Sequence, residues 1–208
     1  MDIAEISKQL EDTGYIVLAK QLEDTGYIVL AKPLADDLLE KLFARCQDDP
    51  ARFHAAQVGR GAAKREIGSI RGDVIDWLDA DNSSDRIYLA CMDELRLGLN
   101  AALFLGLFDY ECHYAIYEKG AGYAKHSDVL QGKKNRILTT VLYLNKDWQA
   151  ANGGELVVYD PTGMSVIARV NPAFGTMIIF LSESFPHEVL TSLATRRSIT
   201  GWFRVSGS

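Results

Sequence analysis

Apolar residues in the first half of the chain recur at helical spacing. Leucines at positions 34, 38, 39 and 42 follow Pro33, a favourable first helical residue, and this pattern predicts a helix that ends near Gln47. A second helix is predicted from about Ser83 to Leu105. Residues 55–72, which lie between the two helices, are glycine-rich and basic, and long loops in compact domains often cover binding sites.

From Tyr110 onward, short strand-like runs alternate with turn residues. The runs read ECHYAIYE, RILTTVLYLN, GELVVYD, SVIARV, TMIIFL, HEVL and RSITGWFRV. Many short strands at this spacing indicate a sandwich or barrel. We therefore predict a single α+β domain over 1–208. Its jelly-roll core (a double-stranded β-helix) at 109–208 packs against helices within 33–108, and residues 1–32 form an N-terminal segment.

A perfect twelve-residue repeat lies near the start of the chain. QLEDTGYIVLAK occupies residues 9–20 and again residues 21–32. Two copies of so short a unit do not make a solenoid. TGYIVLAK is typical of a strand after a glycine turn, and the second copy runs directly into the first helix, so we assign the strand to that copy. The first copy is predicted to be an added edge strand or a poorly anchored extension, without a function.

Composition narrows the class of protein. The net charge of −6 argues against a nucleic-acid partner, because phosphate contacts need a basic surface. The N-terminus lacks the pattern of a secretory signal, and the longest apolar run, near 101–108, is too short to span a bilayer. The three cysteines show no paired spacing, so no zinc ribbon or disulfide framework is indicated. We expect a cytoplasmic protein that does not bind a membrane.

The histidines provide a candidate metal site. His126 and Asp128 are two residues apart, so on an extended segment both side chains point to the same side. A second, distant imidazole completes the set of two histidines and one carboxylate that is typical of non-haem Fe(II) oxygenases. Of the remaining candidates, His54, His113 and His187, we choose His187, which starts a late strand.

Nine residues beyond His187, Arg196 opens the last predicted strand. Strand alternation places Arg196 on one face together with Ser198, Thr200 and Trp202, and Arg197 on the other. A guanidinium inside a barrel needs an anionic partner, and arginine pairs with a carboxylate through two parallel hydrogen bonds. A small dicarboxylate held between the metal and Arg196 satisfies both requirements, and 2-oxoglutarate fits this description.

Residues 110–204 resemble the catalytic core of the hypoxia-inducible-factor prolyl hydroxylases and their bacterial relatives, which are Fe(II)- and 2-oxoglutarate-dependent oxygenases. The matching stretches are GY at 122–123, HSD at 126–128, YLNKDW at 143–148, GGEL at 153–156, PHEV at 186–189, ATR at 194–196, IT at 199–200 and Trp202. Upstream, IRGD at 70–73 and Trp77 resemble the family's substrate-loop region.

The resemblance implies a role for each matching residue. It implies that Fe(II) is bound by His126, Asp128 and His187. It implies that the far carboxylate of 2-oxoglutarate pairs with Arg196, accepts a hydrogen bond from Tyr143 and lies near Tyr117. The implied walls of the co-substrate pocket are Val141, Leu156, Thr200 and Trp202. Two departures from the family pattern are a segment before His126 that is one residue shorter, and an arginine at 197 in place of an aromatic residue.

The resemblance also implies a substrate side. Residues from about 57 to 73 form a loop that closes over the substrate, Arg71 faces the substrate, and Asp73 pairs with Arg136 to hold the loop. The implied reaction is hydroxylation of a prolyl residue in a protein, with O2 consumed and ascorbate as reductant. Bacterial relatives act on elongation factor Tu, which is therefore the first candidate partner.

Two alternatives remain open. The first is an oxygenase for a free amino acid or another small molecule, which has the same ligands but a narrow closed pocket in place of an open groove. The second is a non-enzymatic, cupin-like module that holds a metal structurally.

Overall fold

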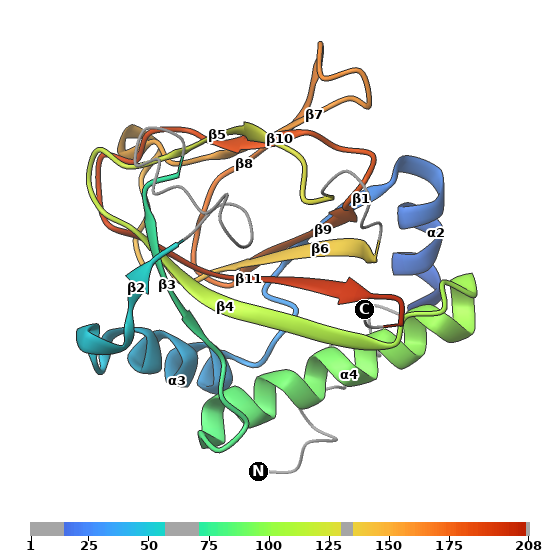
Figure 1. Cartoon of the computed structure of the whole chain (residues 1–208), viewed down its shortest axis with the longest axis horizontal. Helices are drawn as coiled ribbons and strands as arrows, with labels where there is room; N and C mark the ends of the chain where they lie inside the picture. The colour runs from blue at the N-terminus through green and yellow to red at the C-terminus, as the bar shows by residue number, and fades with distance from the viewer. Residues whose placement is uncertain (1–14, 57–70, 130–134, 207–208) are drawn as a thin grey trace, which may run out of the picture.

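Two β-sheets lie face to face in the computed structural model, which describes residues 15–56, 71–129 and 135–206 (Figure 1). The larger sheet has the strand order β1-β9-β6-β11-β4-β3-β2, and the smaller has the order β5-β10-β7-β8. Every described strand pairing is antiparallel. The helices cover the side of the larger sheet that faces away from the smaller one. The predicted α+β jelly-roll fold is confirmed.

The larger sheet contains β1 (Tyr27–Ala31), β2 (His54–Ala55), β3 (Asp73–Trp77), β4 (Asp109–Tyr117), β6 (Arg136–Tyr143), β9 (Thr176–Leu181) and β11 (Arg196–Arg204). The smaller sheet contains β5 (Tyr123–His126), β7 (Leu156–Tyr159), β8 (Val166–Val170) and β10 (His187–Val189). The helices are α2 (Tyr15–Thr25), α3 (Asp36–Gln47) and α4 (Ser83–Leu103), with short 3-10 turns at Pro50–Arg52 and Ala150–Asn152.

The two predicted helices are confirmed as α3 and α4. The buried face of α3 includes Leu38, Leu39 and Leu42, which follow the predicted spacing. The start of α4 is set by Asn82, whose side chain accepts hydrogen bonds from two backbone amides of the first turn. The helix ends at Phe104, which adopts a left-handed conformation with φ 54°.

The YIVLA segments of the two repeat copies adopt different structures. YIVLA of the second copy forms β1, which pairs with β9 as predicted, but YIVLA of the first copy forms the first half of α2. The prediction of an edge strand or a loose extension is wrong, because α2 buries Leu18, Ala19 and Leu22 on one face and lies against α4. Gly26, with φ 78°, ends the helix and leads into β1.

Strands β3 and β5 carry parts of the site but were absent from the sequence prediction. Charged residues interrupt both segments, DVIDW and YAKH, and hide the apolar alternation that marks a strand. β3 pairs with β4, and β5 pairs with β10, so both are placed by long-range partners. Residues 57–70 of the predicted substrate loop lie outside the described residues.

Two apolar clusters occupy the two sides of the larger sheet. The outer cluster joins the helices to side chains such as Ile199 and Phe203 of β11. The inner cluster lies between the sheets and includes Val158, Ile178 and Phe180. The alternation of β11 therefore separates helix-facing residues from residues that face the space between the sheets. None of the described helices is long and apolar enough to cross a membrane.

Candidate metal and co-substrate site

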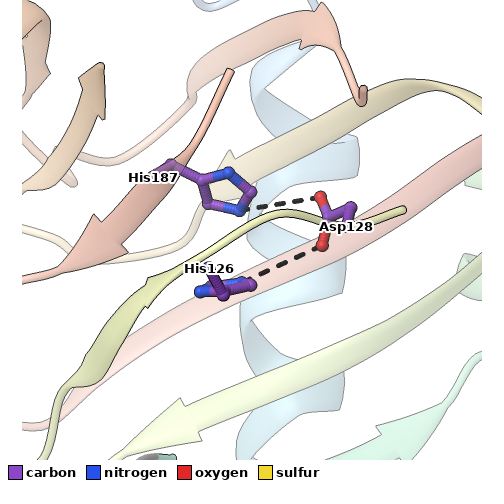
Figure 2. Close-up of side chains that lie close together, drawn as sticks. All are labelled: His126, Asp128 and His187. Carbon is purple, nitrogen blue, oxygen red and sulfur yellow. Dashed lines mark ion pairs between the residues drawn. The ribbon is translucent and has the colours of Figure 1, made fainter. Parts of the chain in front are cut away.

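His126, Asp128 and His187 converge on one point between the sheets, as Figure 2 shows. One ligand atom from each residue lies within 4.8 Å of the others. The Asp128 carboxylate lies 3.9 Å from Nε2 of His126 and 3.6 Å from Nε2 of His187. The two histidines are direct partners in the β5–β10 pairing, so residues 61 positions apart in sequence meet through strand register.

Backbone carbonyl groups fix the orientation of both imidazole rings. Nδ1 of His126 lies 2.8 Å from the carbonyl oxygen of Ala124, and Nδ1 of His187 lies 3.0 Å from that of Phe185. Because a carbonyl only accepts, each Nδ1 carries the proton. Each Nε2 therefore presents a lone pair to the point where the three side chains meet, as metal coordination requires.

The protonation states also suit a divalent metal. Burial, together with the neighbouring His187, lowers the pKa of His126 to about 4. Burial alone would raise the pKa of Asp128, but the two histidines and a hydrogen bond from Thr139 hold that pKa below its usual value. At neutral pH the site therefore offers a neutral imidazole and a charged carboxylate, without displacing protons. Two histidines and one carboxylate form a donor set that fits Fe(II).

A chain of buried hydroxyl groups supports Asp128, and the sequence analysis did not identify it. Thr139 donates its hydroxyl hydrogen to Oδ2 of Asp128 over 2.7 Å. The same hydroxyl lies 2.9 Å from Ser182, which must be the donor there because Thr139 has no second hydrogen to give. Thr139 and Ser182 are both fully buried, on β6 and beside β9. The chain holds one carboxylate oxygen and leaves Oδ1 free for a metal.

Arg196 lies at the other end of the space between the sheets. Its side chain is only 1% exposed, and its described hydrogen bonds are to the carbonyl of Gly154 at 2.9 Å and the hydroxyl of Ser198 at 3.4 Å. No carboxylate among the described residues pairs with it. Its guanidinium lies 5.1 Å from the ring centre of Tyr117 and 5.0 Å from that of Tyr143.

Two buried groups at this end lack the partners that burial demands. One is the Arg196 cation, and the other is the Tyr143 hydroxyl, which makes no hydrogen bond within the described part of the chain. A carboxylate placed between them supplies the missing charge and the missing acceptor. These residues therefore fit one end of 2-oxoglutarate, while the metal ligands fit the other.

One cavity of about 350 Å³ joins the metal ligands to Arg196. Of the other residues predicted for the co-substrate pocket, the cavity is lined by Tyr117, Val141, Leu156, Thr200 and Trp202. Tyr143 does not line it but lies beside Arg196. The residues predicted for the substrate side also line the cavity: Arg71, Asp73 and Arg136.

The alternation of side chains along β11 places the two neighbouring arginines on opposite faces, as predicted. Arg196 points into the cavity, whereas Arg197 does not line it. The backbone amide and carbonyl of Arg197 bind the side chain of Asn145, 2.6 and 3.0 Å away. Arg197 also lies near the thiol of Cys46, which belongs to the cluster of apolar residues against the helices.

The predicted pair between Asp73 and Arg136 is not formed. Asp73 instead accepts two hydrogen bonds from Arg71, at 2.6 and 2.9 Å, and Arg136 binds Glu111 at 2.9 Å. Strand register explains the difference. Asp73 lies opposite Tyr117 at one end of β4, whereas Arg136 pairs with Arg204, which lies opposite Asp109 at the other end. Residues eight apart on a strand are separated by about 27 Å.

Several cavity residues were not identified from the sequence. The ring of Tyr123 stacks on His126 with centroids 3.6 Å apart, and the Arg71 guanidinium lies over the Tyr123 ring, 5.0 Å from its centroid. Glu111 and His113 share the cavity face of β4 with Tyr117. Counting back from Tyr117 in steps of two gives both residues, so alternation was the signal that could have found them.

The family comparison agrees with this geometry. A model of the 2OG-Fe(II) oxygenase superfamily matches residues 112–204. Human prolyl hydroxylase EGLN3 is 33% identical over 155 residues, which cover 69% of this chain and 61% of EGLN3. Human Egl nine homolog 1 is 33% identical over 143 residues, which cover 64% of this chain and 33% of that protein. The chain thus spans less than two thirds of the length of either relative.

Among the solved structures that match nearly the whole chain, two are prolyl hydroxylases with a TM-score of 0.82. A prolyl-4-hydroxylase from Pseudomonas putida has a TM-score of 0.82 and 37% identity, covering 92% of this chain and 99% of that one. A prolyl hydroxylase from Trichoplax adhaerens, in complex with a hypoxia-inducible-factor peptide fragment, has a TM-score of 0.82 and 26% identity, covering 95% and 90%. Since fold, donor set and relatives agree, the chain belongs to the 2OG-Fe(II) oxygenase superfamily and is of the prolyl hydroxylase type.

Proposed function

We propose that the chain is a dioxygenase that uses Fe(II), 2-oxoglutarate and O2 to hydroxylate a prolyl residue within a polypeptide. The observation that carries this proposal is one cavity with a metal-binding triad at one end and a buried cation without a carboxylate partner at the other. When bound, the metal and 2-oxoglutarate supply the activation of O2, with ascorbate as the reductant that maintains ferrous iron.

The chain's own residues position the co-substrate. Arg196 pairs with the carboxylate of 2-oxoglutarate that lies farther from the metal, and Tyr143 donates its free hydroxyl to the same group. His126, Asp128 and His187 hold the metal at the opposite end of the cavity. Tyr117 lies near the co-substrate, and the walls that keep water from it are formed by Val141, Leu156, Thr200 and Trp202.

The surroundings of the cavity favour a polypeptide over a small molecule. A second hollow of about 660 Å³ adjoins the cavity and shares Tyr123 and Val189 with it. It is lined by Gly72 and by residues 120–124 and 188–191, and its surface is mainly polar, which suits the backbone of an extended chain. Arg71, Asp73 and Arg136 line the cavity and are proposed to contact the substrate. Elongation factor Tu is the first candidate, because bacterial members of the family act on it.

The test is a turnover assay with the full chain, Fe(II), 2-oxoglutarate and ascorbate. Elongation factor Tu and a panel of prolyl peptides serve as substrates, and succinate and peptide mass are measured. We expect a mass gain of one oxygen atom on a prolyl residue with the wild type, and neither product with His126→Ala. Arg197→Ala, whose side chain lies outside the cavity, is the matched control and is expected to remain active.

Two results would replace this proposal. Hydroxylation of free proline or another amino acid, without modification of any protein or peptide, would favour the small-molecule oxygenase. Metal binding without succinate formation from any substrate would favour the cupin-like module.

A further inference from the structure

His113 lies in the cavity wall between two indole rings. Its ring centre is 5.2 Å from that of Trp77 at an interplanar angle of 84°, and 5.6 Å from that of Trp202 at 57°. Strand register sets this arrangement, because His113 on β4 is the direct partner of Trp77 on β3 and of Thr200 on β11. All four side chains line the cavity, and His113 itself is 2% exposed.

The hydrogen bonding of His113 defines its tautomer. Nδ1 lies 3.1 Å from the carbonyl oxygen of Tyr114, and a carbonyl only accepts, so Nδ1 carries the proton. Burial lowers the pKa of His113 to about 4, and the ring is therefore neutral at neutral pH. Nε2 is left as an acceptor that makes no hydrogen bond to any described residue.

The neighbours of His113 do not satisfy this acceptor. Arg136 is engaged with Glu111 and stacks on the Trp202 ring, 3.6 Å from the ring centre. Arg71 is engaged with Asp73 through two hydrogen bonds. The metal triad does not include His113. Because His113 lines the cavity and the described hydrogen bonds leave its Nε2 without a partner, this acceptor is available to a donor brought by a ligand.

We propose that Nε2 of His113 accepts a hydrogen bond from a backbone N–H of the polypeptide substrate, and so makes His113 a specificity-determining residue. This inference rests on the proposed function. A prolyl residue has no backbone N–H, so the donor belongs to a neighbouring residue of the substrate. The indole faces of Trp77 and Trp202 contact the apolar ring surface of the substrate, while His113 binds the polar backbone beside that ring.

The hydrogen bond is tested by removing its donor and its acceptor separately and together. The probe is the peptide that gives the largest prolyl mass gain in the turnover assay. Variants of this peptide carry one N-methyl group each, at successive backbone nitrogens on both sides of the prolyl residue. kcat/KM is measured for wild type, His113→Leu and His113→Gln with Fe(II) and 2-oxoglutarate present.

We expect one N-methyl position to lower kcat/KM roughly tenfold in the wild type and to have little effect in His113→Leu, where the acceptor is already absent. His113→Gln, which supplies a carbonyl acceptor, keeps the sensitivity to N-methylation. Ile75→Val is the matched control, because it changes an apolar cavity residue and leaves the acceptor in place. If His113→Leu fails to fold, His113→Phe removes the acceptor in the same way.

Equal effects of N-methylation in wild type and His113→Leu at every position would overturn the inference, while prolyl hydroxylation by the wild type would leave the proposed function standing. If the wild type hydroxylates no prolyl peptide or protein, the proposed function fails, and the inference about His113 fails with it.

Discussion

The two ends of the cavity face of β11 differ in how their charged side chains are paired. At the Arg196 end, a guanidinium that is 1% exposed has no carboxylate partner among the described residues. At the Trp202 end, Arg136 binds Glu111, and Arg204 binds both Glu111 and Asp109, so two cations meet two carboxylates. The Arg196 end is therefore complete only with a ligand that brings its own negative charge, whereas the Trp202 end is balanced without one. In the proposed function, electrostatics select the co-substrate at one end, and shape and neutral hydrogen bonds select the substrate at the other.

The largest effect is expected at the Arg196 end. Arg196→Ala should weaken 2-oxoglutarate binding roughly 100-fold or more, because it removes a buried charge pair. Arg197→Ala should change it less than about twofold, since that side chain lies outside the cavity. Dissociation constants measured anaerobically for the metal-loaded protein check both values. A larger loss of 2-oxoglutarate affinity in Arg197→Ala than in Arg196→Ala would contradict the assignment of Arg196 to the cavity face of β11.

A smaller effect is expected where the hydroxyl chain supports the metal ligand. Thr139→Val removes the hydrogen bond to Asp128 and should weaken metal binding roughly 10-fold or more. Thr139→Ser keeps the hydroxyl and should restore most of the affinity. Co(II) titration followed by visible absorption measures both variants. Unchanged affinity in Thr139→Val would show that the buried hydroxyls serve only packing.

At the Trp202 end, single charge changes should have a modest effect that is confined to the polypeptide substrate. Arg136→Gln should lower kcat/KM for a prolyl peptide about fivefold, because it removes an ion pair that is part exposed and a cation stacked on Trp202. Affinity for 2-oxoglutarate should stay within twofold. Loss of 2-oxoglutarate binding in this variant would mean that the two ends do not act separately.

The smallest effect concerns the neutral imidazole near the Trp202 end. Burial lowers the pKa of His113 to about 4 from an ordinary 6.5. Between those values the unfolded chain holds a proton that the folded ring excludes, so this residue's contribution to stability is lost as pH falls. The free energy of unfolding of the wild type should drop by about 1 kcal/mol more than that of His113→Gln between pH 7 and pH 5.5. Denaturant titrations at both pH values measure the difference. Equal drops in the free energy of unfolding of wild type and His113→Gln would show that His113 is in contact with water and keeps its ordinary pKa.

Local spacing was enough to predict much of the site. His126 ends β5 and Asp128 follows it by two residues, in a bend just past the strand, so their nearness in sequence was enough to pair them. Arg196 and Arg197 are separated by strand parity within β11. The choice of His187 needed in addition its place at the start of a late strand, and its role stays a prediction. The jelly roll followed from the density of strand-like runs between turns.

Contacts that depend on register between distant strands could not be predicted. The partner of Asp73 follows from the pairing of β3 with β4, and β3 was hidden by its charged residues. YIVLA of the first copy forms a helix, whereas the strand position beside β9 is filled by YIVLA of the second copy. Tertiary context therefore overrides local propensity for this segment. The division of the chain at 32 and 108 stays a prediction.

The central claim is that His126, Asp128 and His187 hold one metal beside a co-substrate anchored by Arg196. Anaerobic addition of Fe(II) to the protein with 2-oxoglutarate, followed by visible absorption, tests it most directly, because chelation of Fe(II) by a 2-oxo acid produces a charge-transfer band. We predict the band at one equivalent of Fe(II) in the wild type and in Arg197→Ala, and no band in His187→Ala. A band of full intensity in His187→Ala, or none in the wild type, would contradict the account.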